Sequence, residues 1–304
     1  MSTSIEWTDE TWNPVVGCTK VSQGCKNCYA KTLHDKRHKA YLDGKQMPKQ
    51  YAEPFETIQL KPERLEQPLH WRNPRKIFVN SVSDLFHEQV PFEFIDRVFA
   101  IMAATPKHTY QILTKRPERM HLYLRNLYKK PLPNVWLGTS VENQDVIHRI
   151  DELRQVPAVL RFLSCEPLLG PLELDLHDIH WVIVGGESGK DARPMHPDWA
   201  RAIRDQCIEA DVPFFFKQWG AYGSTCLRGE QRVFRTFENK QQWINKASSW
   251  VNGGTCVGAN GKVLKIGGDF SDSKVYPVAV MHKMSTKRAG CELDGRTWGE
   301  FPTT

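Results

Sequence analysis

The sequence lacks several features that would place the chain in a specialised class. It has no uninterrupted apolar run of about 18 residues, so no transmembrane helix is expected. Residues 1–7 are polar and lack the basic-then-apolar order of a signal peptide. Charge of one sign is not abundant, because 41 Lys and Arg stand against 35 Asp and Glu, a net charge of +6. This charge is compatible with nucleic acid but does not alone argue for it. We therefore expect a cytoplasmic protein without membrane association.

Reduced thiols are the rule in the cytoplasm, so the eight cysteines are expected to be ligands or small buried residues. Cys18, Cys25 and Cys28 lie within eleven residues at C-x6-C-x2-C spacing, with no fourth cysteine nearby. A structural zinc site closes with four ligands, whereas a reactive metal centre keeps one position open. The spacing indicates an iron–sulfur or zinc centre. Zinc with His34 or His38 as a distant ligand, or three unrelated cysteines with one disulfide, are the alternatives.

Apolar strands and amphipathic helices alternate through most of the chain. The 304 residues suffice for one large α/β domain or two small ones. The apolar pair Val15-Val16 within residues 1–17 predicts a short first strand or extended segment that enters the cysteine loop. Strands are predicted over 76–84, 109–116, 134–143, 159–167, 181–189 and 213–219, and helices over 29–42, 91–104, 117–127, up to about 156, and 197–210. This order predicts an α/β fold, a partial (β/α) barrel of six or seven parallel strands.

The alternation stops near residue 220. Gly, Ser and Asn clusters follow, and residues 259–262 carry a hairpin turn signal. We expect residues 1–220 to form the barrel, with the cysteine loop near its N-terminus. Residues 221–304 are expected to form a small α+β appendage that covers the barrel mouth or binds a partner.

Polar residues follow each predicted strand. In a parallel barrel these strand ends share one face, where active sites form. One such cluster would indicate only a turn, but the repetition favours a site. The clusters are Asn80, Ser81, Ser83 and Asp84; Thr114, Lys115 and Arg116; Ser140, Glu142 and Asn143; Ser164 and Glu166; Glu187 and Ser188; and Lys217 and Gln218.

A three-cysteine loop ahead of a βα barrel resembles the radical S-adenosylmethionine superfamily. The sequence resembles more closely a phage-associated three-cysteine-motif family within or beside that superfamily. The matching segments are 12–14, 17–18, 24–30, 80–86, 113–117, 140–143, 166–169, 185–189, 215–220 and 293–296. They run through nearly all of the first 220 residues.

The resemblance implies an enzyme with two cofactors, a [4Fe–4S] cluster and S-adenosylmethionine. Three cysteines hold the cluster, whose fourth iron binds S-adenosylmethionine, and one electron from a flavodoxin- or ferredoxin-type reductant yields a 5′-deoxyadenosyl radical. A phage setting and a likeness to spore photoproduct lyases imply a nucleobase substrate, a thymine derivative in phage DNA or nucleotide. Isomerase or lyase chemistry is favoured, in the host cytoplasm if the chain is phage-encoded.

The resemblance also implies roles for individual residues. Cys18, Cys25 and Cys28 bind the cluster. Ser83 and Asp84 hold the methionine amino group, because an ammonium requires hydroxyl and carboxylate acceptors. Lys115 or Arg116 pairs with the methionine carboxylate or a substrate phosphate. The remaining cofactor-binding candidates are Asn80, Ser81, Ser140, Glu142, Asn143 and Glu187, and the catalytic candidates are Cys165, Glu166 and Lys217.

Three departures from the superfamily pattern affect this reading. The first cysteine gap is six residues instead of three, but a longer loop closes at little extra entropic cost. Asn27 precedes the third cysteine where an aromatic is usual, so the adenine contact stays unassigned. Gly185-Gly186-Glu187 lies later than the superfamily's Gly-Gly-Glu segment, which indicates a ribose or substrate contact, or a tight turn with positive φ.

Two other functions fit the cysteine loop. One is a zinc-stabilised nucleic-acid-binding partner protein without radical chemistry. The other is a cluster protein that only senses or transfers electrons.

Overall fold

A computed structural model describes residues 3, 5–127, 130–264 and 272–303. Its central element is a seven-stranded parallel sheet curved into a half-barrel, with strand order β1-β4-β5-β6-β7-β8-β9. The strands are β1 (Glu10–Trp12), β4 (Lys76–Val79), β5 (Thr109–Thr114), β6 (Val135–Ser140), β7 (Leu160–Cys165), β8 (Trp181–Gly185) and β9 (Phe214–Gln218). The predicted α/β half-barrel is therefore confirmed.

Buried apolar runs explain why these segments are strands. Every residue of β6 and of β8 is buried, as expected for strands covered on both faces by a parallel α/β arrangement. Gly138 in β6 lets the Phe162 ring lie directly over the strand, because an added Cβ would come within 2.6 Å of that ring. The sheet interior is thus filled by a large side chain packed against a glycine.

The predicted helices are present with nearly the expected ends. They are α1 (Tyr29–Leu42), α2 (Phe92–Ala104), α3 (Pro117–Leu127), α4 (Arg149–Arg154) and α5 (Pro197–Glu209). In α2, five apolar residues lie on the buried face, and Pro91 at the N-cap marks its start. The α3 and α5 helices each begin with a proline, whose fixed φ suits the first helical turn.

The N-terminal segment divides into two short strands. Glu10–Trp12 forms the edge strand β1, whereas β2 (Val15–Val16) turns away and pairs antiparallel with β3 (Gln59–Leu60). The Trp12 indole donates to the Arg64 carbonyl at 2.8 Å and is fully buried. The expected extended segment before the cysteine loop is therefore present.

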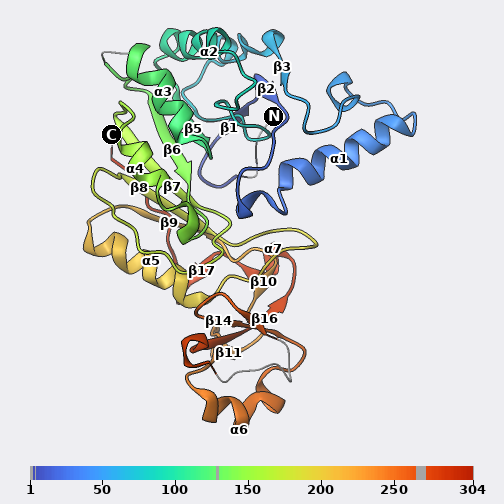
Figure 1. Cartoon of the computed structure of the whole chain (residues 1–304), viewed down its shortest axis with the longest axis vertical. Coiled ribbons are helices and arrows are strands. Elements are labelled where there is room, and N and C mark those ends of the chain that lie inside the picture. Colours follow the sequence, from blue (N-terminus) through green and yellow to red (C-terminus); the bar gives the residue numbers. More distant parts are fainter. Residues whose placement is uncertain (1–2, 4, 128–129, 265–271, 304) are drawn as a thin grey trace. The chain divides into compact units, whose positions relative to one another are not determined.

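The chain divides into two compact units. Unit 1 contains residues 1–140 and 148–163, and unit 2 contains residues 141–147 and 164–304. Figure 1 shows α2 and α3 beside β5 in unit 1, and α6 against the strands β14 and β16 in unit 2. The predicted boundary at residue 220 stays a prediction.

A small C-terminal appendage is present, as expected. Its main sheet contains β10 (Tyr222–Gly223), β13 (Arg235–Phe237), β14 (Thr255–Gly258), β15 (Val263–Leu264) and β16 (Val278–Lys283). The predicted turn at residues 259–262 joins β14 to β15. Trp243 of α6 (Lys240–Trp250) packs with Phe237, Val278 and Val280 in one apolar cluster. Two further antiparallel pairs are β11 (Leu227–Arg228) with β12 (Gln231–Arg232) and β17 (Glu292–Leu293) with β18 (Arg296–Thr297). The last described helix is α7 (Thr286–Ala289).

Within the described part of the chain, no helix has the length and apolar character needed to cross a membrane.

His196 joins α5 to the segment before β16. Its Nδ1 accepts from the Asp198 amide at 3.1 Å, so the proton lies on Nε2, which donates to the Pro277 carbonyl at 3.1 Å. Burial lowers the pKa of His196 from 6.5 to about 4, while Asp198 and the Pro277 carbonyl oppose that shift. The neutral ring is therefore part of the folded state.

We predict that His196 makes stability fall as the pH drops from 6.5 towards about 4. In this window the unfolded chain binds a proton that the folded chain excludes, so stability is present above the unfolded pKa and lost below it. Urea unfolding should show that His196→Asn, which keeps a capping acceptor, removes up to about 3 kcal/mol of the pH dependence. An unchanged pH dependence in this variant would contradict the assignment.

Candidate functional site

The cysteine loop, residues 17–28, begins at the carboxyl end of strand β4. Gly17 forms a parallel β-bridge with Ser83, and the Cys18 amide donates to the Phe55 carbonyl at 3.0 Å. Gly17 has a φ of +97°, and a Cβ there would lie 2.3 Å from the Thr57 carbonyl oxygen. Only glycine fits this entry to the loop. The loop therefore starts where the sequence predicted a site, at a strand end.

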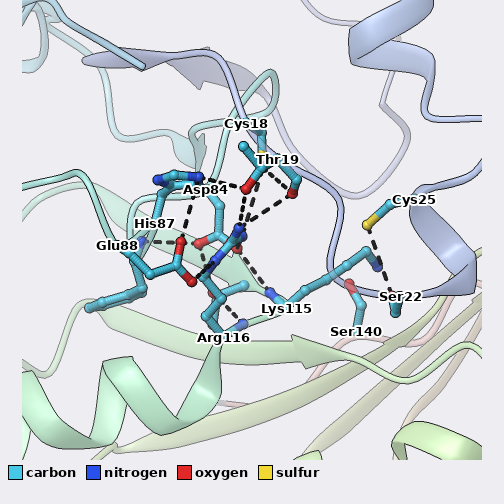
Figure 2. Close-up of polar contacts among 12 residues, drawn as sticks. Cys18, Thr19, Ser22, Cys25, Asp84, His87, Glu88, Lys115, Arg116 and Ser140 are labelled. Carbon is cyan, nitrogen blue, oxygen red and sulfur yellow. Dashed lines mark hydrogen bonds and ion pairs between the residues drawn. The ribbon is translucent and has the colours of Figure 1, made fainter. Parts of the chain in front are cut away.

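The three cysteines of the loop are free and half-buried, and no disulfide joins them. Cys25 ends the short 3-10 helix η1 (Gln23–Cys25), and Cys28 immediately precedes α1. The Cys25 thiol lies 3.9 Å from the Ser22 hydroxyl (Figure 2). The loop thus presents three thiols on one short segment of unit 1.

Cys18 differs from the other two because it meets a cation. Arg116 Nη1 lies 3.8 Å from Cys18 Sγ (Figure 2). Burial and the Asp84 carboxylate raise the pKa of the Cys18 thiol to about 12, and Arg116 acts in the opposite direction. The thiol is therefore protonated near neutral pH, and a bound metal would have to displace that proton.

Arg116, directly after β5, uses all five of its N–H groups inside unit 1. Nε donates to Glu88 at 2.7 Å, and Nη1 faces both Asp84 at 3.1 Å and Cys18. Nη2 donates to the Thr19 carbonyl at 3.3 Å and to the Thr19 hydroxyl at 3.1 Å. A guanidinium has five donors and no more, so this side chain has none left for a ligand carboxylate or phosphate. Burial opposes the charge, but Asp84, Glu88 and Cys18 together raise the pKa of Arg116.

Asp84 is the buried counterpart of this guanidinium. Its Oδ1 accepts from the Phe86 amide at 3.0 Å and from the Thr114 hydroxyl at 2.7 Å. Its Oδ2 accepts from the Lys115 amide and from Arg116, both at 3.1 Å. A carboxylate has about four acceptor positions, and all are filled here. Asp84 therefore ties the end of β4 to the end of β5.

His87 completes the contacts around Thr19. Its Nδ1 accepts from the Gln89 amide at 3.2 Å, so Nε2 carries the proton and donates to the Thr19 hydroxyl at 2.8 Å. Burial and the charge of Arg116 lower the pKa of His87, which keeps the ring neutral. We call Cys18, Thr19, Asp84, His87, Glu88 and Arg116 the Arg116 network. Thr19, His87 and Glu88 were not predicted, although His87 and Glu88 closely follow Asp84 in the sequence.

Asn80, Ser81 and Ser83 bind the segment that leads into the cysteine loop. Asn80 Oδ1 accepts from the Val15 amide at 3.3 Å, and Ser83 Oγ donates to the Val15 carbonyl at 2.7 Å. Ser81 Oγ donates to Asn13 Oδ1 at 3.1 Å. Asn80 is buried with a φ of 60°, and its Nδ2 has no hydrogen-bond partner. These side chains therefore fix the chain before Cys18, and their cofactor contacts stay predictions.

Lys115 and Ser140 face the other side of the loop. Figure 2 shows the Lys115 side chain extended towards Ser22 and Cys25, with Ser140 beside it. The Ser140 carbonyl accepts from Arg149 at 2.9 Å. Lys115 thus extends towards Cys25, the second cysteine, whereas Arg116 contacts Cys18, the first.

The donor chemistry of the loop fits a thiolate-held metal group, but the thiols are not gathered around one point. Among the described residues, no three His, Cys, Asp or Glu side chains are arranged to hold a metal ion. His34 and His38, the alternative zinc ligands, bond the backbone carbonyls of Glu53 and Tyr51 at 2.9 and 2.8 Å. Thiols are the ligand type of iron–sulfur and zinc centres, and the binding of a cluster by the three free cysteines stays a prediction.

A second group of predicted residues meets in unit 2. Lys217 of β9 places its Nζ 2.8 and 2.9 Å from the two Glu166 oxygens. Gln218 Nε2 lies 3.5 Å from Glu166 and 3.0 Å from the Ser188 hydroxyl. We call Glu166, Ser188, Lys217 and Gln218 the Glu166 cluster. It offers a carboxylate, an ammonium, an amide and a hydroxyl at neighbouring strand ends.

Gly185 and Gly186 lie beside this cluster, where the Glu166 side chain and the Trp219 backbone come close to them. Neither residue has a positive φ, so the tight-turn interpretation is wrong. A Cβ on Gly186 would lie 2.1 Å from the Trp219 carbonyl oxygen, and one on Gly185 would lie 3.2 Å from the Glu166 carboxyl group. The Trp219 backbone therefore requires a glycine at position 186, whereas a side chain at position 185 would have to displace the Glu166 carboxyl group by a few tenths of an ångström.

The remaining predicted residues of unit 2 lie in separate surroundings. Glu187 is buried, and its Oε2 accepts hydrogen bonds from the Arg193 amide at 2.8 Å and from Arg193 Nε at 2.9 Å. Glu142 is fully buried, and its carbonyl accepts the Leu169 amide at 2.8 Å. Asn143 donates to Asp145 at 3.1 Å, and its Oδ1 is buried without a hydrogen-bond partner. Cys165 is fully buried at the end of β7. Arg193 was not predicted from the sequence.

Together, the fold and the site define a parallel α/β half-barrel protein with a three-cysteine loop at a strand end. The chain belongs to the family described as "Protein of unknown function (DUF5131)", whose model matches residues 2–302. No curated protein and no solved structure matches the chain.

We predict that Gly17→Ala destabilises the protein far more than Gly44→Ala does. Both glycines have positive φ, +97° and +76°, but a Cβ on Gly44 has no atom within 4 Å. Gly44→Ala should therefore cost about 1–2 kcal/mol from its backbone conformation alone. Gly17→Ala adds a clash with backbone oxygens, and urea unfolding should show a cost several times larger. Equal costs would show that the entry to the loop is not rigid.

A double-mutant cycle tests the Glu166–Lys217 pair. The two side chains are only 21% and 17% exposed, so Lys217→Met leaves a mostly buried carboxylate without its ammonium. We expect this variant to lose about 1–3 kcal/mol of unfolding free energy. Glu166→Gln combined with Lys217→Met should recover part of that loss. Strict additivity of the two single changes would contradict a coupled pair.

Proposed function

We propose that this protein is a radical S-adenosylmethionine enzyme that binds a [4Fe–4S] cluster through Cys18, Cys25 and Cys28. The observation that carries the proposal is the Gly17–Ser83 bridge, which places the cysteine loop at the carboxyl end of a strand in a parallel half-barrel. Strand carboxyl ends are where βα-barrel proteins build their active sites. The resemblance of the sequence to the superfamily supports the same reading.

When bound, such a cluster supplies one electron for reductive cleavage of S-adenosylmethionine. We divide the chain's own residues into those that hold the site together and those that would contact S-adenosylmethionine. The hydrogen-bonding positions of Asp84 and Arg116 are all used by other residues of the chain. We therefore assign these two side chains to holding the site together, not to binding the methionine group. Lys115 is the cation we assign to the methionine carboxylate, since its side chain is directed towards Cys25 (Figure 2). Ser83 and Ser140 supply acceptors for the amino group and for a ribose hydroxyl.

We assign the substrate to the nucleobases, with a thymine derivative in DNA or a nucleotide as the preferred candidate. Support comes from the resemblance and from the Glu166 cluster, whose carboxylate and amide complement the edge of a base. Glu166, Lys217 and Cys165 are the candidate catalytic residues, and Glu142, Asn143 and Glu187 the candidate cofactor contacts of unit 2. Isomerisation and bond cleavage are the preferred reaction types.

Anaerobic reconstitution with iron and sulfide tests this proposal without relying on turnover. We expect about four iron and four sulfide per chain and a broad visible absorption band. Cys25→Ser should abolish most of the bound iron. Cys226→Ser is the matched control, because Cys226 is also free and half-buried but lies outside the loop. This control should retain the wild-type iron content.

Two outcomes would overturn the proposal in different ways. A colourless protein with one tightly bound zinc would establish the zinc-stabilised alternative. A brown protein that forms no 5′-deoxyadenosine from S-adenosylmethionine under reduction, with or without thymidine-containing DNA, would leave only an electron-transfer or sensing role.

A further inference from the structure

We propose that the helix α1 and the segment directly after it form a docking surface for the phosphate backbone of nucleic acid. This inference deepens the proposed function, because it selects a nucleic-acid polymer over a free nucleotide as the substrate, and that link alone rests on the proposed function. The docking itself depends only on charge and exposure within unit 1.

The first argument is that the excess positive charge of the chain is concentrated in one short segment. Residues 20–49, which we call the basic segment, contain eight Lys and Arg but only two acidic residues, Asp35 and Asp43. Their net charge of +6 equals that of the whole chain, because the other 274 residues contain 33 charges of each sign. A modest overall charge thus conceals a strong local one. Clustered positive charge is the electrostatic footprint of a nucleic-acid surface.

The second argument is that α1 holds this charge in solvent. Of its 14 residues, only Ala30 and His34 are buried, and the His34 ring packs against Tyr51 and Phe55. Figure 1 shows α1 extending outwards from the strands of unit 1. The helix is therefore attached along one narrow face. The exposed cations of α1 and of the segment after it are Lys36, Arg37, Lys39, Lys45 and Lys49.

The third argument is that the chain does not neutralise most of these cations itself. Asp35 pairs with Lys31 at 3.1 Å, and Lys31 also meets Glu56 at 2.7 Å. In the part of the chain that the structure describes, no ion pair forms at the lysines of positions 36, 39, 45 and 49. Their counter-charge must come from solution. Phosphates that replace those bound counterions release them, which favours binding.

The same surface does not suit a membrane or a protein partner. Leu33 and Leu42 of α1 are 38% and 68% exposed, but nine positions separate them. Nine residues are about two and a half helical turns, so the two side chains lie on opposite sides of the helix. A helix that lies in a membrane surface needs one continuous apolar face. Protein interfaces are depleted in Lys at their centres, whereas phosphate contacts need only cations.

DNA binding by the full chain as purified tests the docking surface. Fluorescence anisotropy measures the affinity for a short labelled DNA duplex and for one of its strands alone over a range of salt concentrations. The test variant carries Lys36→Gln, Lys39→Gln, Lys45→Gln and Lys49→Gln. The matched control removes four exposed lysines of unit 2 instead, by Lys240→Gln, Lys262→Gln, Lys274→Gln and Lys287→Gln. Both variants have a net charge of +2, so they differ only in where the charge is removed.

We expect the salt dependence to reveal the phosphate contacts. For duplex DNA, the slope of log affinity against log salt should become shallower by about 0.9 for each replaced lysine that contacts a phosphate. The affinity of the test variant at low salt should fall at least about tenfold, and that of the control should change less than about threefold. Arginine at the same four positions keeps the charge and should keep the wild-type affinity.

Three outcomes would overturn the docking surface. They are equal losses in the test and control variants, wild-type protein that binds neither form of DNA, and binding to phosphatidylserine vesicles but not to DNA. Circular dichroism and thermal unfolding confirm that the variants are folded. Because the binding assay does not involve iron, docking can fail in a protein that binds a cluster and forms 5′-deoxyadenosine. Docking by a protein that binds no cluster would leave the surface established and remove only its link to the proposed reaction.

Discussion

The buried ion pair between Arg116 and Asp84 is the interaction on which the candidate site depends. Asp84 accepts from residues at the ends of two neighbouring strands, β4 and β5, and Arg116 carries this connection to the cysteine loop. Removing either partner would leave a charge in a nearly water-free position, which costs more than the pair gains. The pair therefore acts as a geometrical constraint: it fixes where Cys18 lies relative to the sheet of unit 1.

The fold could be predicted from local patterns because its strands are continuous apolar runs. Segments such as Trp181–Gly185 are buried throughout, and the helices α3 and α5 start at prolines that the sequence displays directly. The cysteine loop was also visible, since its three ligand-type residues lie within eleven positions. These features depend on neighbours along the chain, which a single sequence contains.

The roles within the site depended on contacts between distant residues. Arg116 was expected to bind a ligand, but its five donors are taken by residues from segments 28 to 98 positions away. The Gly185-Gly186 pair was open to a turn interpretation, yet the Trp219 backbone from another segment occupies the space that a side chain on Gly186 would need. Residue type predicts which chemistry is available, and only the packing decides which partners use it.

The two compact units have a consequence for how the chain is made. Residues 141–147 belong to unit 2 although unit 1 lies on both sides of them in the sequence. No single cut of the polypeptide therefore yields either unit complete. During synthesis, unit 1 can be completed only after residue 163 has left the ribosome, when the first segment of unit 2 has already emerged. That early segment, which carries Glu142 and Asn143, meets its first partners when Ser164 and Leu169 emerge, before the rest of unit 2 has been made.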